Sequence, residues 1–92
     1  KSPKNSSFQM YVAGQINQCP VYRLEFDNQL KNEFQIVWKD KFGTILYDEF
    51  VSGKQIIRNY MIDLAEIGNT DLYVEINDQY GRRIQEFKMD KR

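Results

Sequence analysis

The stretch DKFGTILYDEF, residues 40–50, and the stretch DQYGRRIQEF, residues 78–87, share one pattern. Each begins with Asp, a long polar residue, an aromatic residue and Gly, and each ends on Phe. The pattern is either a duplicated functional site or one structural device used twice. Asp can bond to its own backbone two residues on, and Gly supplies the positive φ of a short hairpin loop. Because residues 1–39 and 51–77 do not repeat each other, we interpret both stretches as hairpin turns.

Around these turns, apolar residues recur with a period of two, which places successive side chains on opposite faces of a strand. Four runs alternate in this way, with expected inward residues Phe8, Met10 and Val12; Tyr22, Leu24 and Phe26; Phe34, Ile36 and Trp38; and Leu72, Val74 and Ile76. Three further runs, residues 44–51, 55–62 and 82–89, alternate less cleanly. All five glycines are expected between runs, and Pro20 at the start of the second. The pattern predicts an all-β, antiparallel two-sheet sandwich of about seven strands.

The length of 92 residues fits one domain. Residues 1–7, KSPKNSS, are polar and predict a flexible leader, so the single β-sandwich domain is expected over residues 8–92. DLAEIG, residues 63–68, predicts one helical turn in which Leu64 and Ile67 are buried and Gly68 ends the turn.

The charge balance is even, with 13 Lys and Arg residues against 13 Asp and Glu residues. Such a chain has no overall field to attract nucleic acid or anionic lipid, so neither is expected as a partner. No stretch is long and apolar enough to predict a transmembrane segment. Since the sequence does not begin with Met, we expect a processed or trimmed product.

The residues that carry most enzyme chemistry are missing. The chain has no His, which excludes Ser-His-Asp and Cys-His arrangements, and its one cysteine, Cys19, is expected to be a half-buried residue beside a turn. It has no phosphate-binding loop and a poor set of metal ligands. Neighbouring carboxylates, such as Asp48 with Glu49, are expected on wet strand faces. We therefore expect no catalytic residues, no cofactor, no metal site and no enzyme activity.

Aromatic residues are the remaining signal, at 14% of the chain. Alternation places Trp38 inward, on a third run that is expected to be central because strands precede and follow it. It places Tyr47 and Tyr73 on the wetter faces of their runs. Exposed tyrosines can stack on sugars or anchor a protein partner, and cross-strand packing explains them as well. Tyr47 and Tyr73 are therefore the candidate contact residues.

Residues 33–89 also carry a resemblance, in the pieces FQIVWKDKFGTILYDEF, NYMIDLAEI and DLYVEINDQYGRRIQEFKM. This order of strands and hairpins resembles the small immunoglobulin-like sandwich modules of exported bacterial proteins. It is similar in particular to the C-terminal sorting domains of the type IX (Por) secretion system. The resemblance implies an immunoglobulin-like sandwich in the periplasm or outside the cell, with its export signal removed, and brings no catalytic residues with it.

Two functions remain open at this stage. The first is a non-catalytic exported module that contacts an unknown protein partner in the cell envelope or outside. The alternative is a carbohydrate-binding module that uses exposed tyrosines. A flat, unpaired edge strand or a symmetric dimer would favour the first function. A row of aromatic residues beside an acid-amide cluster would favour the second.

Overall fold

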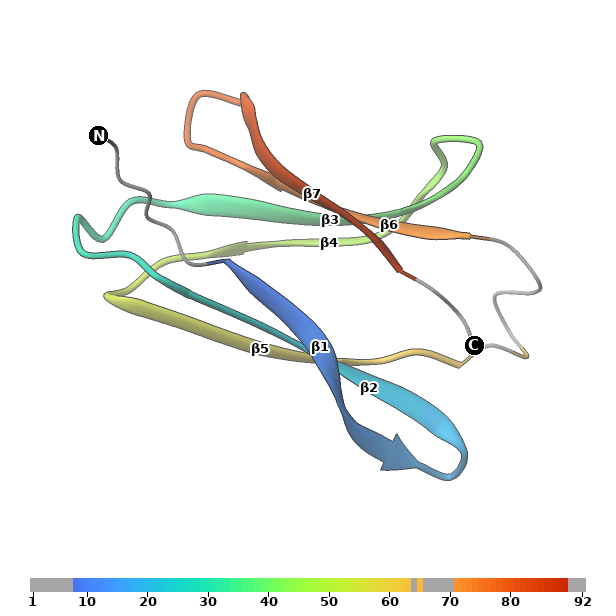
Figure 1. The fold of residues 1–92 in the computed structure, drawn as a ribbon. Coiled ribbons are helices and arrows are strands. Elements are labelled where there is room, and N and C mark those ends of the chain that lie inside the picture. Colours follow the sequence, from blue (N-terminus) through green and yellow to red (C-terminus); the bar gives the residue numbers. More distant parts are fainter. Residues whose placement is uncertain (1–7, 64, 66–70, 90–92) are drawn as a thin grey trace.

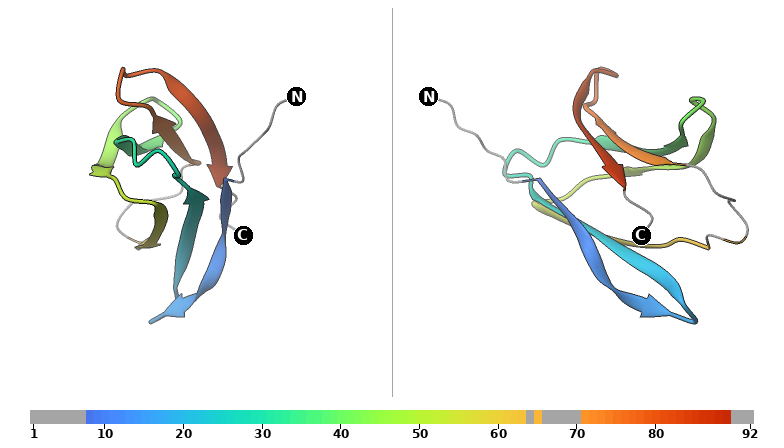
Figure 2. Two further views of the ribbon diagram at one scale, coloured as in Figure 1. Left: turned by 90° about the vertical axis from the view of Figure 1, so that its left-hand side faces the viewer. Right: turned by 45° about the vertical axis from the view of Figure 1, so that its right-hand side comes forward.

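The computed structural model describes residues 8–63, 65 and 71–89, and these residues form two facing layers of strands (Figures 1 and 2). The seven strands are β1 (Gln9–Ile16), β2 (Cys19–Asp27), β3 (Phe34–Asp40), β4 (Ile45–Val51), β5 (Gln55–Met61), β6 (Leu72–Asn77) and β7 (Arg83–Met89). Every strand pairing is antiparallel. The predicted all-β, two-sheet sandwich is therefore confirmed.

One sheet has the strand order β1-β2-β5 and the other has the order β4-β3-β6-β7. The third strand is central, as predicted, but the reason given for this was wrong. Its neighbours are β4 and β6, whereas β2, which precedes it in the chain, belongs to the other sheet. In a seven-stranded constant-type immunoglobulin domain the fourth strand joins the first, second and fifth. Here β4 pairs with β3, which leaves β4 and β5 as edges along one side of the sandwich.

The core lies between the sheets and is built from the inward residues of the alternating runs. Its members are Tyr22, Leu24, Phe26, Phe34, Ile36, Trp38, Ile56, Tyr60, Ile62, Leu72, Val74, Ile76 and Met89. Trp38 is only 2% exposed and packs against the rings of Tyr22 and Tyr60. The inward placement of Trp38 and the register of its strand are therefore confirmed.

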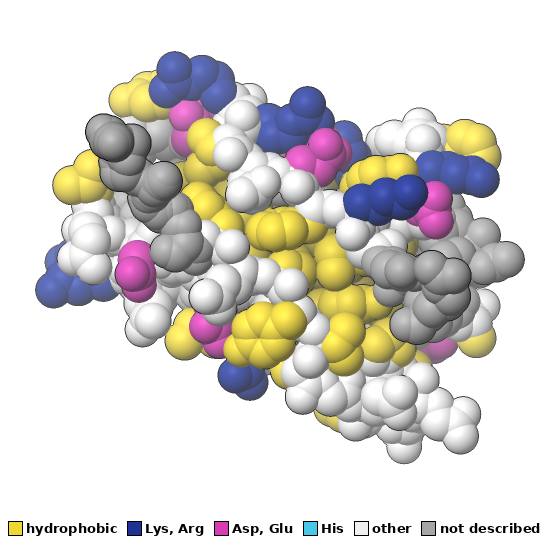
Figure 3. Space-filling view, viewed as in Figure 1, with side chains coloured by type: hydrophobic (Ala, Val, Ile, Leu, Met, Phe, Trp, Pro, Cys, Tyr) yellow, Lys and Arg dark blue, Asp and Glu magenta, His cyan; other side chains and the backbone are white. Residues whose placement is uncertain are grey.

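The first strand departs from the prediction. Val12 lies opposite the buried Tyr22 and so faces the core side, yet it is 56% exposed. Figure 3 shows hydrophobic side chains gathered at the surface between β1 and β7. Gly14 is not between strands, because β1 continues to Ile16 and is interrupted by a bulge between Val12 and Gly14. Gly often marks such a bulge, where the chain bends and twists more strongly.

The two Asp-x-aromatic-Gly stretches are hairpin turns, as predicted. The Asp40 carboxylate accepts hydrogen bonds from the backbone N–H groups of Phe42 and Thr44, both at 2.9 Å. Asp78 accepts the same two bonds from residues 80 and 82, also at 2.9 Å. Gly43 has a φ of 88° and Gly81 a φ of 82°. The same device therefore starts both β4 and β7, the edge strands of the larger sheet.

The hairpin between β1 and β2 uses a different turn. Asn17 and Gln18 have φ values of 52° and 69°, so two residues with side chains occupy left-handed positions. Cys19 follows this turn and is half-buried, as predicted. The predicted leader at residues 1–7 and the helical turn with Leu64, Ile67 and Gly68 lie outside the described residues, apart from Asp63 and Ala65.

Candidate functional site

The side of the sandwich between β4 and β5 carries the most distinctive arrangement of side chains. On β4, the inward residues are Tyr47, Glu49 and Val51, because they pair with the buried Trp38, Ile36 and Phe34. On β5, the inward residues are Ile56, Arg58 and Tyr60, which pair with Phe26, Leu24 and Tyr22. We call this surface, from residues 45–51 and 55–63, the β4–β5 side.

Glu49 joins the two sheets across the β4–β5 side. Its carboxylate accepts hydrogen bonds from Arg58 Nη2 at 2.7 Å and from Arg58 Nε at 3.0 Å. It also accepts a hydrogen bond from the Tyr60 hydroxyl at 2.5 Å and from the Tyr47 hydroxyl at 3.2 Å. Charge-assisted bonds of this kind, with a two-pronged Arg contact, are among the stronger polar interactions in proteins. The contacts tie the edge of one sheet to the edge of the other.

The ionisation of these groups follows from their contacts. Partial burial raises the pKa of Glu49, but the hydrogen bonds from Arg58 and Tyr60 outweigh burial and hold its pKa below the ordinary value. Burial, and then the bond to Glu49, raise the pKa of Tyr60 well above its ordinary range. At neutral pH Glu49 is thus a carboxylate that already accepts several bonds, and Tyr60 is a neutral phenol.

A groove of about 750 Å³ lies on one side of the Glu49–Arg58 ion pair. Its lining residues are Trp38, Leu46, Tyr47, Asn59, Tyr60, Met61, Ile62 and Asp63. The Tyr47 and Tyr60 rings meet edge to face at 6.1 Å, and the Tyr60 and Trp38 rings lie 5.1 Å apart. The indole Nε1 of Trp38 is buried and has no hydrogen-bond acceptor within the described ranges. The groove therefore combines the exposed ring of Tyr47 with the buried rings of Tyr60 and Trp38 and with Asp63, whereas the Asn59 amide accepts a hydrogen bond from Arg23 on the outer face of β5.

A smaller hollow of about 310 Å³ lies on the other side of the same ion pair. It is lined by residues 50–52 and 55–58. Since the larger groove is lined by residues 46–47 and 59–63, the Glu49–Arg58 ion pair divides the β4–β5 side into two hollows.

The two candidate tyrosines lie on opposite faces of their sheet. Tyr47 is 49% exposed, but it faces the groove, because it pairs with the inward Trp38. Its expected place on the outer, wetter face was wrong, and its exposure comes from its position on an edge strand. Tyr73 is half-buried on the outer face, between Lys39 and Lys88. The structure therefore brings Tyr47 into the groove and leaves Tyr73 far from it.

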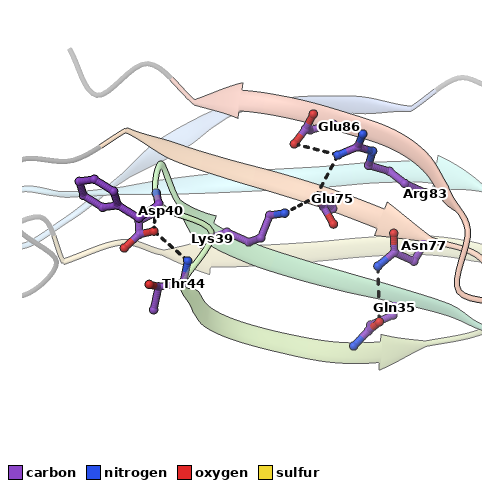
Figure 4. A network of polar contacts seen from close by, with 9 residues as sticks. Gln35, Lys39, Asp40, Thr44, Glu75, Asn77, Arg83 and Glu86 are labelled. Carbon is purple, nitrogen blue, oxygen red and sulfur yellow. Dashed lines mark hydrogen bonds and ion pairs between the residues drawn. The ribbon is translucent and has the colours of Figure 1, made fainter.

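The outer face of the larger sheet holds a polar network (Figure 4). Glu75 accepts hydrogen bonds from Lys39 and Arg83, and Arg83 also pairs with Glu86. The bond from Lys39, and then the bond from Arg83, lower the pKa of Glu75 despite some burial. Gln35 bonds to Asn77 on β6 (Figure 4) and to Asp48 on β4. Because these side chains bond to one another across neighbouring strands, they stabilise the sheet face.

The neighbouring carboxylates Asp48 and Glu49 lie on opposite faces of the larger sheet. Asp48 is exposed on the outer face, as expected, whereas Glu49 turns inward, so the expectation of a wet face was wrong for Glu49. Glu49, Arg58 and Tyr60 were all missed as members of a site. The alternation of Tyr47, Glu49 and Val51 could have placed Glu49 inward, but the sequence gives no sign that Arg58 faces it from the other sheet.

The described part of the chain contains no cluster of three or more side chains that could hold a metal ion. Within the same residues no helix is long and apolar enough to cross a membrane. Comparison with family models, with curated proteins and with solved structures finds no match to this chain. The function therefore has to be argued from the β4–β5 side itself.

Proposed function

We propose that this chain is a non-catalytic binding module that contacts another protein through its β4–β5 side. The observation that carries the proposal is the apolar surface of two adjacent edge strands. Six large hydrophobic residues on these strands are at least 41% exposed. Tyr47 faces inward, Leu46 lies at the bulge of β4, Ile45 and Phe50 lie on the outer face of β4, and Ile57 and Met61 lie on the outer face of β5. Apolar side chains exposed on edge strands can mark interaction sites.

The strand geometry suggests how a partner would bind. Among the described residues β4 pairs with β3 alone, so its other edge presents backbone N–H and C=O groups without strand partners there. An extended segment of a partner can add to such an edge through its backbone, while alternate side chains enter pockets. The two hollows beside the Glu49–Arg58 ion pair are placed to receive those side chains. The favoured partner is therefore a protein with an exposed, extended apolar segment.

Two features of the sequence and the structure support the proposal that the module is not catalytic. The chain has no His, and Glu49, the carboxylate beside the groove, is held ionised by Arg58 and Tyr60. Turnover of a sugar, ester or peptide substrate that disappears on the change Glu49→Gln would overturn this part of the proposal.

The cellular location in the proposal is the periplasm or the outside of the cell. Its support is the resemblance of residues 33–89 to exported bacterial sandwich modules, including the type IX sorting domains. Expression of the protein from its natural gene in its source organism, followed by cell fractionation, tests this location. Recovery of the protein in the cytoplasmic fraction would contradict it.

Binding is tested by selection from a displayed library of random linear peptides. We expect enrichment of apolar, β-prone peptides that bind the wild-type chain and lose at least tenfold in affinity on Leu46→Lys or Tyr47→Ala. Tyr73→Ala is the matched control, because Tyr73 lies on the outer face of the same sheet. Enriched peptides that bind all three variants equally would show that the β4–β5 side is not the contact surface.

Carbohydrate binding is the second candidate, and the composition of the larger groove favours it specifically. Tyr47 is 49% exposed, its ring meets the buried Tyr60 ring edge to face at 6.1 Å, and Asp63 in the groove lining can bond to sugar hydroxyl groups. A glycan array probed with wild type and with Tyr47→Ala tests this candidate. Sugar binding that depends on Tyr47, without any peptide enrichment, would replace the first proposal by the second.

A further inference from the structure

We propose that a second copy of this chain pairs edge to edge with β1, which joins two β1-β2-β5 sheets into one continuous sheet. Within the part of the chain that the structure describes, β1 is an edge strand, because it pairs with β2 alone. It lies at the edge opposite β5, so the pairing leaves the β4–β5 side free in both copies. The inference thus stands apart from the proposed function.

The first argument compares the four edge strands of the described residues. A strand that pairs antiparallel with its own copy about its middle residue places that residue opposite itself. The middle residue is Asp48 in β4, Arg58 in β5 and Glu86 in β7. Like charges directly opposite each other destabilise a strand pair, so these three edges resist self-pairing. Charged residues on edges are a common protection against such contacts.

β1 differs from the other edges because its sequence, QMYVAGQI, contains no charged residue and no Pro. Its only irregularity is the bulge after Val12. Since a bulge interrupts regular pairing, the part available to a second copy is Phe8 to Val12. The chain as a whole has a formal net charge of zero, so no overall repulsion opposes the approach of two copies.

The second argument is the exposed apolar surface beside β1. Val12 faces the core side but is 56% exposed, and hydrophobic side chains gather between β1 and β7 (Figure 3). The inward side chains of both strands there are uncharged: Phe8, Met10 and Val12 from the first strand region, and Gln85, Phe87 and Met89 from β7. An additional strand beside β1 would cover part of this surface.

Symmetry selects the register of the pairing. A two-fold axis perpendicular to the sheet keeps inward residues opposite inward residues, as an isologous contact requires. With the axis at Met10, Met10 lies opposite its own copy and Phe8 lies opposite Val12 of the other copy. On the outer face, Gln9 lies opposite Tyr11 of the other copy. The exposed Val12 then gains an aromatic neighbour. Because β1 has no charged residue, the pairing places no like charges of the two β1 strands opposite each other.

The test introduces like charges on the outer face of β1 and measures dimerisation by sedimentation equilibrium. We expect wild type to dimerise with a Kd of about 1 mM or less. The variant Gln9→Glu/Tyr11→Glu and the variant Gln9→Lys/Tyr11→Lys should each weaken the dimer by about tenfold or more, because like charges then face each other twice. An equal mixture of the two variants should dimerise at least as well as wild type.

The matched control places the same two lysines on the opposite edge of the same sheet. Gln55→Lys/Ile57→Lys lies on exposed positions of β5 that pair with Asp27 and Glu25, so the fold tolerates it. This control should dimerise like wild type, and circular dichroism melts should show all variants folded. A monomeric wild type, full dimerisation of either charged β1 variant, or a mixture that stays monomeric would overturn the proposal.

Discussion

The β4–β5 side faces away from a second border, which we call the β1–β7 side and which consists of the inward residues Phe8, Met10, Val12, Gln85, Phe87 and Met89. Both sides are bordered by edge strands, yet their inward residues differ. On the β4–β5 side, Glu49 and Arg58 meet across the gap, and Tyr60 adds its hydroxyl. On the β1–β7 side, the inward residues of the two strands carry no charge, and Val12 remains 56% exposed. The inward side chains are therefore joined by directional bonds on the β4–β5 side, whereas on the β1–β7 side they are uncharged and leave Val12 exposed.

The difference shows how a small sandwich can separate stability from interaction. A cross-sheet ion pair with several hydrogen bonds fixes the distance between two edges, so the hollows beside it keep their shape. An apolar border has no such directional bonds and is stabilised when something covers it. This difference agrees with the two proposals above, in which a ligand contacts the hollows of the β4–β5 side and a second copy pairs with β1.

The largest expected effect concerns Trp38, which lies under the β4–β5 side. Trp38→Ala should destabilise the fold by about 3–5 kcal/mol, because it removes a large buried side chain that packs against Tyr22 and Tyr60. A domain has about 5–15 kcal/mol in total, so the variant should be barely folded. Denaturant melts followed by circular dichroism measure this, since the substitution removes the fluorescent residue.

Tyr73→Ala is the comparison for Trp38, because Tyr73 is half-buried on the outer face. Its cost should be clearly smaller, of the order of 1 kcal/mol, which is typical of point changes outside the core. Equal costs for the two variants would mean that Trp38 does not anchor the core.

The second prediction removes the charge that joins the β4–β5 side. Glu49→Gln should cost about 1–2 kcal/mol, because the hydrogen bonds from Arg58 and Tyr60 lose their ionised acceptor. Glu33→Gln, in an exposed position of the loop before β3, is the control and should be close to neutral. If both variants melt like wild type, the ion pair does not hold the two edges together, and the contrast between the two sides fails.

The lowered pKa of Glu49 predicts that the stability of the fold depends on pH. Its pKa is lowered in the folded state, so its contribution is present above the unfolded pKa of about 4.3 and is lost as pH falls through the folded value. Wild type should therefore lose stability as pH falls below about 5. Glu49→Gln should show a shallower loss, whereas the pKa values of Glu75 and Asp78, which are also lowered, keep part of the slope. A slope unchanged by Glu49→Gln would contradict the assignment.

The sequence predicted the core better than it predicted the borders of the sandwich. Leu24, Trp38 and Val74 were placed inward by period-two alternation, and all three are buried. Alternation also placed Val12 on the core side, which its pairing with Tyr22 bears out, but it could not show that Val12 is exposed. Alternation determines the face of a side chain, whereas coverage depends on what the opposite sheet provides.

Contacts between sheets were the part that the sequence could not supply. Glu49 and Arg58 are nine residues apart in the chain and belong to different sheets, so their contact depends on β4 pairing with β3. The turn at Asn17 and Gln18 was not predicted in detail either, because it lacks the glycine that usually signals positive φ. Gly14 was assigned to a loop for the same reason, since Gly marks both turns and bulges.

The third prediction concerns the hairpins that start the two edge strands of the larger sheet. Gly43→Val and Gly81→Val should each cost about 1 kcal/mol or more, because both residues have positive φ. A Cβ at either position would meet nothing within 4 Å, so the cost is backbone strain alone and should be similar at the two sites. Thermal melts of the two variants measure it. If the two variants lose very different amounts of stability, the two sides of the sandwich differ in their hairpin turns rather than in their inward side chains.

The smallest expected effect compares two valines in equivalent places. Val12 on β1 and Val51 on β4 both face inward from edge strands, but Val51 is half-buried and packs against the core. Because the hydrophobic contribution follows the area removed from water, Val51→Ala should cost about 1 kcal/mol and Val12→Ala less than about 0.5 kcal/mol. Denaturant melts at low protein concentration, where the monomer predominates, measure both values. At high concentration Val12→Ala should become more costly than it is at low concentration, since the second copy covers Val12, whereas the cost of Val51→Ala should stay the same. Equal costs for the two valines at low concentration would mean that the β1–β7 side is as well covered as the β4–β5 side, and the difference between the two sides would then be one of charge alone.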